Sequence, residues 1–220
     1  MKTNLHLFST PGKGDIQSII DACRPYLQAQ ARPVLAFLQW ASVQNDWLDY
    51  TREVFSDLAE VLPFNPDPMA LAQNQEILHR CGAVYISGGN TYLLNHLAHT
   101  CGVHAPLRER ALDGLPLICF SAGSLLCGPN ILTTHDINMV PSPHFDGLDL
   151  LPYNLVAHYP STDAARDDED DWLSDYHARH ANPILALEND AYVRWDGSAL
   201  ERVSGRAWIL NPGQSRVELA

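Results

Sequence analysis

The chain has 220 residues, enough for one large domain or two small ones with a sizeable buried core. Hydrophobic residues make up 46% of the sequence and charged residues 18%, which is ordinary for a soluble globular protein. The formal net charge of −12, with no basic stripe anywhere, argues against nucleic acid as a partner and offers no attraction to anionic membranes.

The first half of the chain alternates between short apolar runs and longer segments with a helical repeat. LHLF near the N-terminus, PVLAFLQWA (33–41) and GAVYISGG (82–89) are predicted as strands, because they are short and almost continuously apolar. The helical segments between them are DIQSIIDACRPYL, NDWLDYTREVFSDLAEVL, MALAQNQEILHRC and NTYLLNHLAHTC. The second of these is predicted as one helix over 45–62, which starts on an Asn-Asp cap and has an apolar face from Trp47 to Leu62.

The second half repeats the alternation and then changes character. VHAPLRERALDG is predicted as a helix, LPLICF as a strand, NLVAHY (154–159) as a strand, and the polar segment near 164–180 as a helix. ILALEND (184–190), AYVRWDG and ALERVSGRAWIL follow as strand-like pieces, the last two joined through Asp-Gly and Ser-Gly. Strands alternating with helices predict an α/β fold with a mostly parallel sheet covered on both faces, and the final pieces predict an antiparallel C-terminal edge. No linker divides the chain, so we expect one domain over 1–220.

Several classes of protein are disfavoured by what the sequence lacks. The N-terminal apolar run is too short for the core of a signal peptide, and no stretch approaches the ~18 apolar residues of a membrane span. The five cysteines, an odd and unclustered set, suggest reduced thiols and a cytoplasmic location. The ten histidines form no HxxxH or HxH pair, so no metal site is expected.

Polar residues follow four of the predicted strands at the point where each strand ends. In an open α/β sheet the ligand binds outside the carboxyl ends of the strands, so these residues are expected to share one rim. The residues at these strand ends are Gly88, Gly89, Asn90, Ser121, His158 and the segment Glu188 to Asp190. A glycine pair, a hydroxyl, an imidazole and a carboxylate on one rim predict a catalytic site.

Ser121 stands at a corner between a predicted strand and a short apolar helix. It is either an ordinary helix cap or a nucleophile on a tight strand-turn-helix elbow. The small Ala122 and Gly123 suit an elbow, although Cys119 occupies the position where a glycine is usual. A serine hydroxyl needs a base at neutral pH, and the imidazole of His158 at the same rim is the natural one.

The glycine pair in YISGGNTYLL is either a flexible turn or part of the substrate site. Glycines allow close approach of the backbone, so the N–H of Gly89 could join that of Ala122 in binding an oxyanion. Gly88 and Asn90 are then substrate-binding candidates. A dinucleotide site is not expected, because GxGxxG is absent.

YISGGNTYLLNHL, FSAGSLLCGPNILTTHD and AHYP, in this order and spacing, resemble the motifs of the peptidase E family, the aspartyl dipeptidases. FSTPGKGDIQSII and PVLAFLQWAS are also similar to the family's first two strands, so the likeness covers nearly the whole chain. The resemblance implies a flavodoxin-like three-layer sandwich, like class I glutamine amidotransferase domains but with serine in place of cysteine.

The resemblance also implies roles for single residues. Ser121 would be the nucleophile and His158 the general base of a serine peptidase. For the third member of the triad, Asp136 in TTHD matches a family aspartate, while Glu188 matches a family glutamate after a later strand. A shift of one residue would bring Asn189 or Asp190 to the place of Glu188, so the identity of the orienting residue stays open.

The family's preference for an N-terminal aspartate implies an arginine just after the catalytic histidine. The only candidate is Arg166, as a substrate-binding residue, and five acidic residues (167–171) follow it directly. They are either a solvated helical turn or, if they face the site, a source of repulsion for an acidic substrate side chain. A preference broader than aspartate at the substrate N-terminus is therefore our hypothesis.

The prediction is thus a serine peptidase that hydrolyses short peptides without a cofactor, with a homodimer as a possible assembly. A cyanophycinase-like enzyme or an esterase on the same fold is the first alternative, although GGNT differs from the GGxQ of cyanophycinase-like chains. A non-enzymatic member with a decayed site is the second alternative, which Cys119 keeps open.

Overall fold

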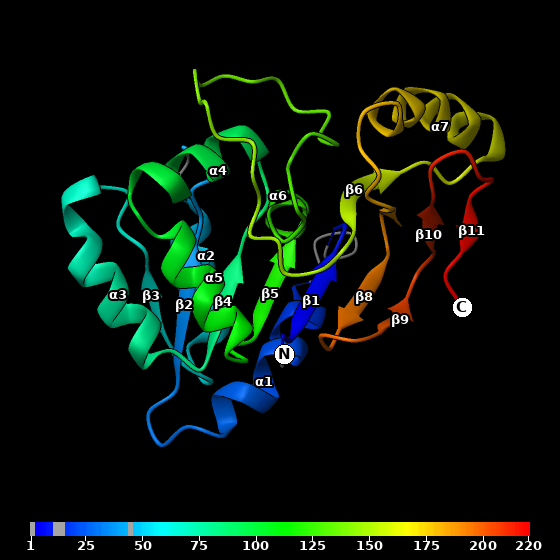
Figure 1. Ribbon diagram of the computed structural model, residues 1–220. Helices are drawn as coiled ribbons and strands as arrows, with labels where there is room; N and C mark the ends of the chain where they lie inside the picture. Colours follow the sequence, from blue (N-terminus) through cyan, green and yellow to red (C-terminus); the bar gives the residue numbers. More distant parts are fainter. Residues whose placement is uncertain (1–2, 11–15, 44–45) are drawn as a thin grey trace.

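The computed structural model describes residues 3–10, 16–43 and 46–220. Its elements form a seven-stranded sheet in the order β3-β2-β4-β5-β1-β8-β9 and a four-stranded sheet in the order β11-β10-β7-β6, which lie beside one another in Figure 1. Over this described part, no helix is both long and apolar enough to cross a bilayer.

The strands have the following bounds: β1 Leu5–Phe8, β2 Val34–Leu38, β3 Glu60–Pro63, β4 Ala83–Ile86, β5 Leu117–Phe120, β6 Asn154–Tyr159, β7 Ile184–Glu188, β8 Tyr192–Trp195, β9 Leu200–Ser204, β10 Ala207–Leu210 and β11 Val217–Glu218. The helices are α1 Gln17–Gln28, α2 Asp46–Phe55, the 3-10 turn Pro68–Ala70, α3 Leu71–Arg80, α4 Thr91–Thr100, α5 His104–Leu112, α6 Ala122–Leu126 and α7 Asp163–His177.

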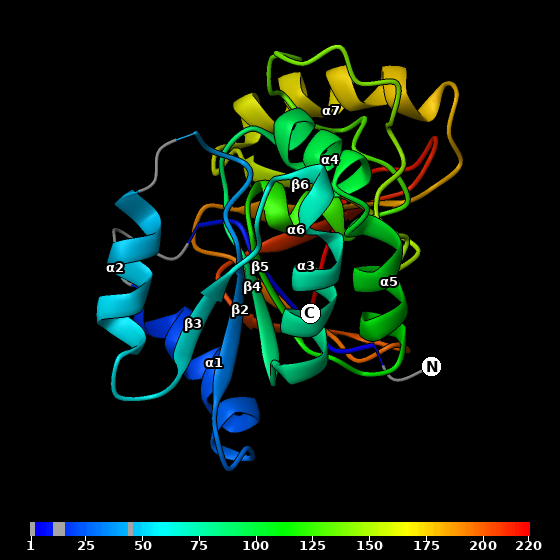
Figure 2. The same ribbon diagram turned by 90° about the vertical axis from the view of Figure 1, so that its left-hand side faces the viewer.

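The larger sheet is parallel from β3 to β1 and becomes antiparallel at β8 and β9. Its strands β1, β2 and β4 are buried on both faces, as their continuous apolar sequences predict. Helices α1 and α2 pack on one face, and α3 to α6 pack on the other, so that Figure 2 shows the sheet between two helical layers. The predicted α/β fold with a mostly parallel sheet, helices on both faces and an antiparallel C-terminal edge is confirmed.

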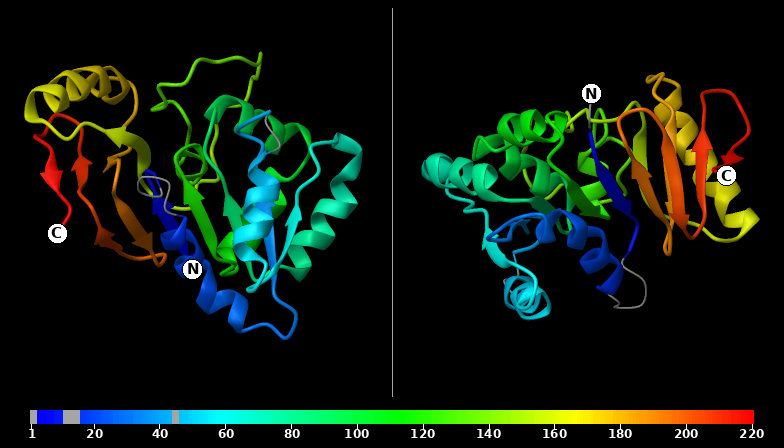
Figure 3. Two further views of the ribbon diagram at one scale, coloured as in Figure 1. Left: turned by 180° about the vertical axis from the view of Figure 1, so that it is seen from behind. Right: turned by 90° about the horizontal axis from the view of Figure 1, so that it is seen from below.

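The smaller sheet is a feature that the sequence analysis did not predict. Strands β6 and β7, expected in the main sheet, pair in parallel with each other, and β10 and β11 extend the second sheet on the far side of β7. Helix α7 packs against one face of this sheet, as the right-hand panel of Figure 3 shows. The piece ALERVSGRAWIL divides into β9 in the larger sheet and β10 in the smaller one.

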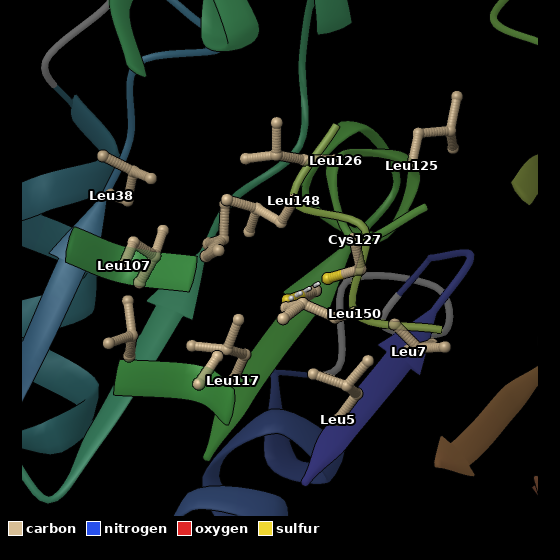
Figure 4. Close-up of a cluster of buried hydrophobic side chains, with 14 of the residues drawn as sticks. Leu5, Leu7, Leu38, Leu107, Leu117, Leu125, Leu126, Cys127, Leu148 and Leu150 are labelled. Atoms are coloured by element: carbon tan, nitrogen blue, oxygen red, sulfur yellow. Dashed lines mark hydrogen bonds between the residues drawn. The ribbon is translucent and has the colours of Figure 1, made fainter. Parts of the chain in front are cut away.

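One apolar cluster contains side chains from both sheets. Leu5 and Leu117 of the larger sheet belong to the same cluster as Leu155 of β6 and Leu187 of β7, and Figure 4 shows part of this cluster around α6. A core shared in this way supports our expectation of one domain over 1–220, which stays a prediction.

The predicted helix over 45–62 is wrong in its second half. Helix α2 ends at Phe55, and β3 then pairs with β2 at the edge of the larger sheet. Pro63 is tolerated there because an edge strand has a side with no ladder hydrogen bonds to lose. The position of Asn45 in the expected Asn-Asp cap lies outside the described residues.

Candidate active site

Ser121 lies on a sharp turn between β5 and α6. Its backbone has φ +50° and ψ −114°, a conformation that residues other than glycine rarely adopt. The turn is fixed by hydrogen bonds: Ser121 N–H donates to the carbonyl of Phe8, and the hydroxyl of Ser124 lies 2.9 Å from the carbonyl oxygens of both Phe8 and Cys119. Strain retained by such contacts is typical of a nucleophile elbow, and not of an ordinary helix cap.

The residues around Ser121 are small because neighbouring backbone comes close. A Cβ at Gly123 would lie 2.5 Å from the carbonyl oxygen of Ile86, and a Cβ at Gly88 would lie 2.7 Å from the Phe120 ring and 3.0 Å from the Cβ of Ser121. Cys119, the departure from the usual motif, is buried, and its sulfur lies 3.5 Å from that of Cys127 (labelled in Figure 4). The elbow therefore accommodates cysteine at this position.

His158 lies opposite Ser121, and its Nε2 is 3.1 Å from the Ser121 Oγ. The histidine sits at an irregularity near the end of β6, where the pairing with β7 shifts register and φ is +61°. Its backbone N–H donates to the hydroxyl of Ser9, which follows β1, at 2.8 Å. His158 is thus held by the residue that follows the first strand of the larger sheet, although it belongs to the smaller sheet.

The other ring nitrogen of His158 contacts Asn189. Nδ1 lies 2.8 Å from the side-chain Oδ1 of Asn189, which stands in the turn between β7 and β8. An amide oxygen only accepts, so Nδ1 carries the proton and Nε2 is free to accept one from Ser121. The N–H of Thr10 donates to the Asn189 carbonyl, which anchors the turn where the two sheets meet.

Glu188, one of the candidates for orienting the imidazole, points into the interior and not to His158. Its carboxylate is buried and accepts from Arg166 at 2.7 Å and from the indole N–H of Trp208 at 3.0 Å. Neighbouring residues of a strand point to opposite faces, and the end of β7 therefore gives Glu188 to the interior and Asn189 to the histidine.

The expected substrate-binding role of Arg166 is also contradicted by its position. The side chain is buried, and its guanidinium donates to the carbonyls of Pro160 and Ser161 and to the carboxylates of Asp163 and Glu188. Arg166 thus ties the end of β6 to α7 and β7 and is not among the residues that line the cavity at Ser121.

Asp136 and Asn90 hold the loop after α6 against α4. Asp136 Oδ2 accepts from the N–H of Thr91 at 2.7 Å and from the hydroxyl of Thr134 at 3.0 Å. The side chain of Asn90 caps α4 by accepting from Leu93 N–H and donates to the loop carbonyl of residue 137. Asp136 lines the cavity, but the contact of the imidazole is with Asn189.

A cavity of about 400 Å³ opens at Ser121 and His158. Gly89 lines it with φ +135°, a conformation that favours glycine, and a Cβ there would lie 2.4 Å from the carbonyl oxygen of Ala41. The backbone of Ala122 follows the nucleophile directly at the start of α6. Gly88 and Asn90 are next to this wall and are not among the described residues that line it.

Sequence reasoning missed a pair of side chains on the far wall of the cavity. His135 Nε2 lies 2.6 Å from Glu169 Oε1, and the His135 ring packs on Trp172 at 4.1 Å between centroids. The hydrogen bond to the Glu169 carboxylate raises the pKa of His135. The two residues are 34 positions apart, and the only signal in the sequence was the acidic run that contains Glu169.

A serine on a strained elbow, an imidazole within hydrogen-bond reach and an acceptor behind that imidazole define a serine hydrolase on an α/β fold. The model of peptidase family S51 matches residues 6–203, so the chain belongs to this family. It is a serine dipeptidase, with hydrolysis of short peptides as its activity. Within the described residues, no group of three His, Cys, Asp or Glu side chains is placed to hold a metal ion.

Two curated proteins illustrate the relationship. The chain is 28% identical to peptidase E of Streptomyces coelicolor over 196 residues, which cover 84% of this chain and 76% of the other. It is 30% identical to the "Probable alpha-aspartyl dipeptidase" of Drosophila melanogaster over 178 residues, which cover 78% and 72% of the two chains.

Solved structures support the same fold. A Listeria monocytogenes EGD-e protein superposes with a TM-score of 0.71 at 19% identity, over 93% of this chain and all of the other. A peptidase from an acI-B1 Actinobacterium superposes with a TM-score of 0.65 at 11% identity, over 100% and 94% of the two chains. At such identities the comparison concerns the fold alone.

Proposed function

We propose that Ser121, His158 and Asn189 carry out the hydrolysis of short peptides as a Ser-His-Asn triad. The observation that supports this most directly is the unbroken chain of contacts, 3.1 Å from Ser121 Oγ to Nε2 and 2.8 Å from Nδ1 to Asn189. An asparagine can take the orienting position, as it does in papain-like cysteine proteases, because its amide oxygen selects the required tautomer.

In the first half of the reaction, Nε2 of His158 takes the hydroxyl proton as Ser121 Oγ attacks the carbonyl carbon of the peptide bond. The tetrahedral intermediate carries a negative oxygen, for which the N–H groups of Gly89 and Ala122 are the proposed donors. Collapse of the intermediate breaks the C–N bond. The imidazolium then returns its proton to the leaving amine, and an acyl-enzyme remains.

In the second half, water takes the place of the amine. His158 removes a proton from the water as the oxygen attacks the acyl carbon, and the proton then goes to Ser121 Oγ as the acid product leaves. In this scheme Asp136 holds the loop after α6 in place by accepting hydrogen bonds from Thr91 and Thr134. Glu188 stabilises the buried scaffold by accepting a hydrogen bond from Arg166.

The surroundings of the site support small substrates and a reducing compartment. A cavity of about 400 Å³ suits a dipeptide or tripeptide. All five cysteines are free and buried, which supports the proposed cytoplasmic location.

Exposed apolar side chains of the loop after α6, Ile137 and Met139, offer surface for the proposed homodimer, which light scattering would test.

Labelling with a serine-directed phosphonate, followed by peptide mass spectrometry, tests the triad. We expect one modified peptide, containing Ser121, and no label in Ser121→Ala. Ser198→Ala, which changes an exposed loop serine, is the matched control and should label like the wild type. Equal labelling of the wild type and Ser121→Ala would contradict the proposal.

A further inference from the structure

The charged groups that line the cavity are predominantly acidic. Of the described residues along its wall, the titratable ones are His135, Asp136, His158 and Glu169, and none is a lysine or an arginine. Arg166, the one cation that the sequence offered for an acidic substrate, is held in the interior by four acceptors. The cavity therefore lacks a permanent positive charge of its own.

The two carboxylates of the wall differ in how they are used. Asp136 accepts from the N–H of Thr91 and the hydroxyl of Thr134, both parts of the protein scaffold. Glu169 instead contacts the His135 ring, whose side chain is 51% exposed, while the Glu169 side chain is 15% exposed. Glu169 is thus a mostly buried carboxylate whose partner, the His135 side chain, is half-exposed.

The other acidic residues of the same helix do not reach the cavity in this way. Asp167 and Asp170 face Arg216, at 2.8 and 2.6 Å, and Asp168 is exposed. The run 167–171 therefore contributes one carboxylate to the cavity, Glu169. When His135 is protonated, its positive charge offsets that of Glu169, and the carboxylate of Asp136 leaves the wall with a net negative charge.

We infer that Glu169 binds a cationic amino group on the N-terminal residue of the substrate. The enzyme therefore prefers peptides that have a free α-amino group and an uncharged or basic first side chain over peptides that begin with aspartate. This inference rests on the proposed function of the same site. The shared chemistry is an ammonium group, which comes either from the substrate's α-amino group or from a basic first side chain.

The behaviour of His135 supports this assignment. The raised pKa of His135 comes first from its hydrogen bond to Glu169, so the carboxylate already stabilises a positive charge at this point. A substrate ammonium would replace the imidazole on the same oxygen. An acidic first side chain would instead enter a wall with Asp136 and Glu169 on it and would be repelled.

The test uses four dipeptides, Leu-Leu, Lys-Leu, Asp-Leu and N-acetyl-Leu-Leu, with kcat/KM measured for the full-length protein. The variants are Glu169→Gln, which removes the charge and keeps the shape, and Glu169→Arg, which inverts the charge. Asp168→Asn is the matched control, since it removes an exposed carboxylate at the position directly before Glu169, outside the cavity. Thermal melts show whether each variant is folded.

In the wild type, we expect kcat/KM for Leu-Leu and Lys-Leu to exceed that for Asp-Leu by about tenfold or more, because Asp136 and Glu169 repel an acidic first side chain. Glu169→Gln should lose about this factor, chiefly through KM, and Glu169→Arg should raise Asp-Leu relative to Leu-Leu. Poor cleavage of N-acetyl-Leu-Leu, with equal losses for Leu-Leu and Lys-Leu, assigns the contact to the α-amino group. A loss confined to Lys-Leu assigns it to the side chain.

An active wild type that prefers Asp-Leu, or a folded Glu169→Gln with unchanged preferences, would overturn this inference alone. In both cases phosphonate labelling of Ser121 would still support the proposed function. A wild type that cleaves none of the four dipeptides and takes no label would overturn the proposed function, and this inference with it.

Discussion

Removal of the buried cation at position 166 should destabilise the protein before it affects substrate binding. Arg166 and Glu188 lie 2.7 Å apart, with side chains 3% and 7% exposed. Breaking a buried pair by removing one partner costs about 3–5 kcal/mol, because the remaining charge stays buried without compensation. Glu188 keeps the indole N–H of Trp208, so the lower part of this range is expected for Arg166→Met.

The loss converts into a melting shift that calorimetry can measure. For a chain of this size, each kcal/mol corresponds to about 2–4 °C, so a loss of about 3–4 kcal/mol in Arg166→Met should lower Tm by roughly 6–16 °C. The surface pair Arg24–Asp21, at 3.6 Å and 44% and 60% exposed, supplies the control Arg24→Met. An exposed pair contributes about 0–1 kcal/mol, so the control should shift Tm by less than about 4 °C.

A double variant distinguishes the broken pair from a simple loss of packing. Arg166→Met with Glu188→Leu removes both charges, and it should be more stable than Arg166→Met alone. Arg166→Met with an unchanged Tm and a raised KM would refute this reasoning, because it would place the guanidinium in contact with substrate.

The remaining predictions concern the elbow, the orienting amide and the rim histidine. Gly123→Ala should cost about 1–3 kcal/mol and most of the activity, because its Cβ would lie 2.5 Å from the Ile86 carbonyl; melts and turnover check it. Asn189→Ala should lower kcat about 10²-fold with little change in KM, because the imidazole loses its orientation, as steady-state kinetics would show. The pKa of His135 is raised, so its pair with Glu169 stabilises the fold at acid pH and is lost as the pH rises through that pKa. Binding of a cationic substrate should strengthen over the same pH rise, with Asp136 adding to the attraction, and His135→Gln should remove this step from the pH profile of KM.

The strand-end rule predicted much of the site from the sequence. Ser121 and His158 were expected at one rim, and they lie within hydrogen-bond distance. The rule worked although β6 belongs to the second sheet, because Ser9 and Thr10, after β1, hydrogen-bond to His158 and Asn189. The rule depends only on where the strands end, so its prediction held although the sequence analysis expected one sheet and the structure has two.

The choice between neighbouring residues at a strand end could not be made from the sequence. Glu188 and Asn189 differ by one position, and one position changes the face of a strand on which a side chain lies. The residue that faces inward is decided by Arg166 and Trp208, which come from a helix and a strand at other places in the chain. Residue type favoured the carboxylate of Glu188 as the partner of His158, whereas the tertiary packing places the amide of Asn189 beside the imidazole.

The failed helix over 45–62 has a similar cause. An apolar repeat can continue past the end of a helix when the following strand is half-buried, and Val61 of β3 is buried while Glu60 is exposed. The His135–Glu169 pair has no local pattern at all. It forms only because the loop after α6 and the first turns of α7 meet across the cavity.

The strand beside His158 also carries a deeply buried ion pair, Glu188 with Arg166. Adjacent residues of β7 and the turn after it face two different neighbours: Glu188 faces Arg166 inside the scaffold, and Asn189 faces His158 at the rim. Arg166 also binds the carbonyls of Pro160 and Ser161, just after the histidine. One buried cation, which does not line the cavity, therefore contacts both chain segments next to the imidazole and its amide partner. A neutral amide in contact with the ring is compatible with this arrangement, because the geometry of the base is maintained by the scaffold and does not depend on a charge beside the imidazole.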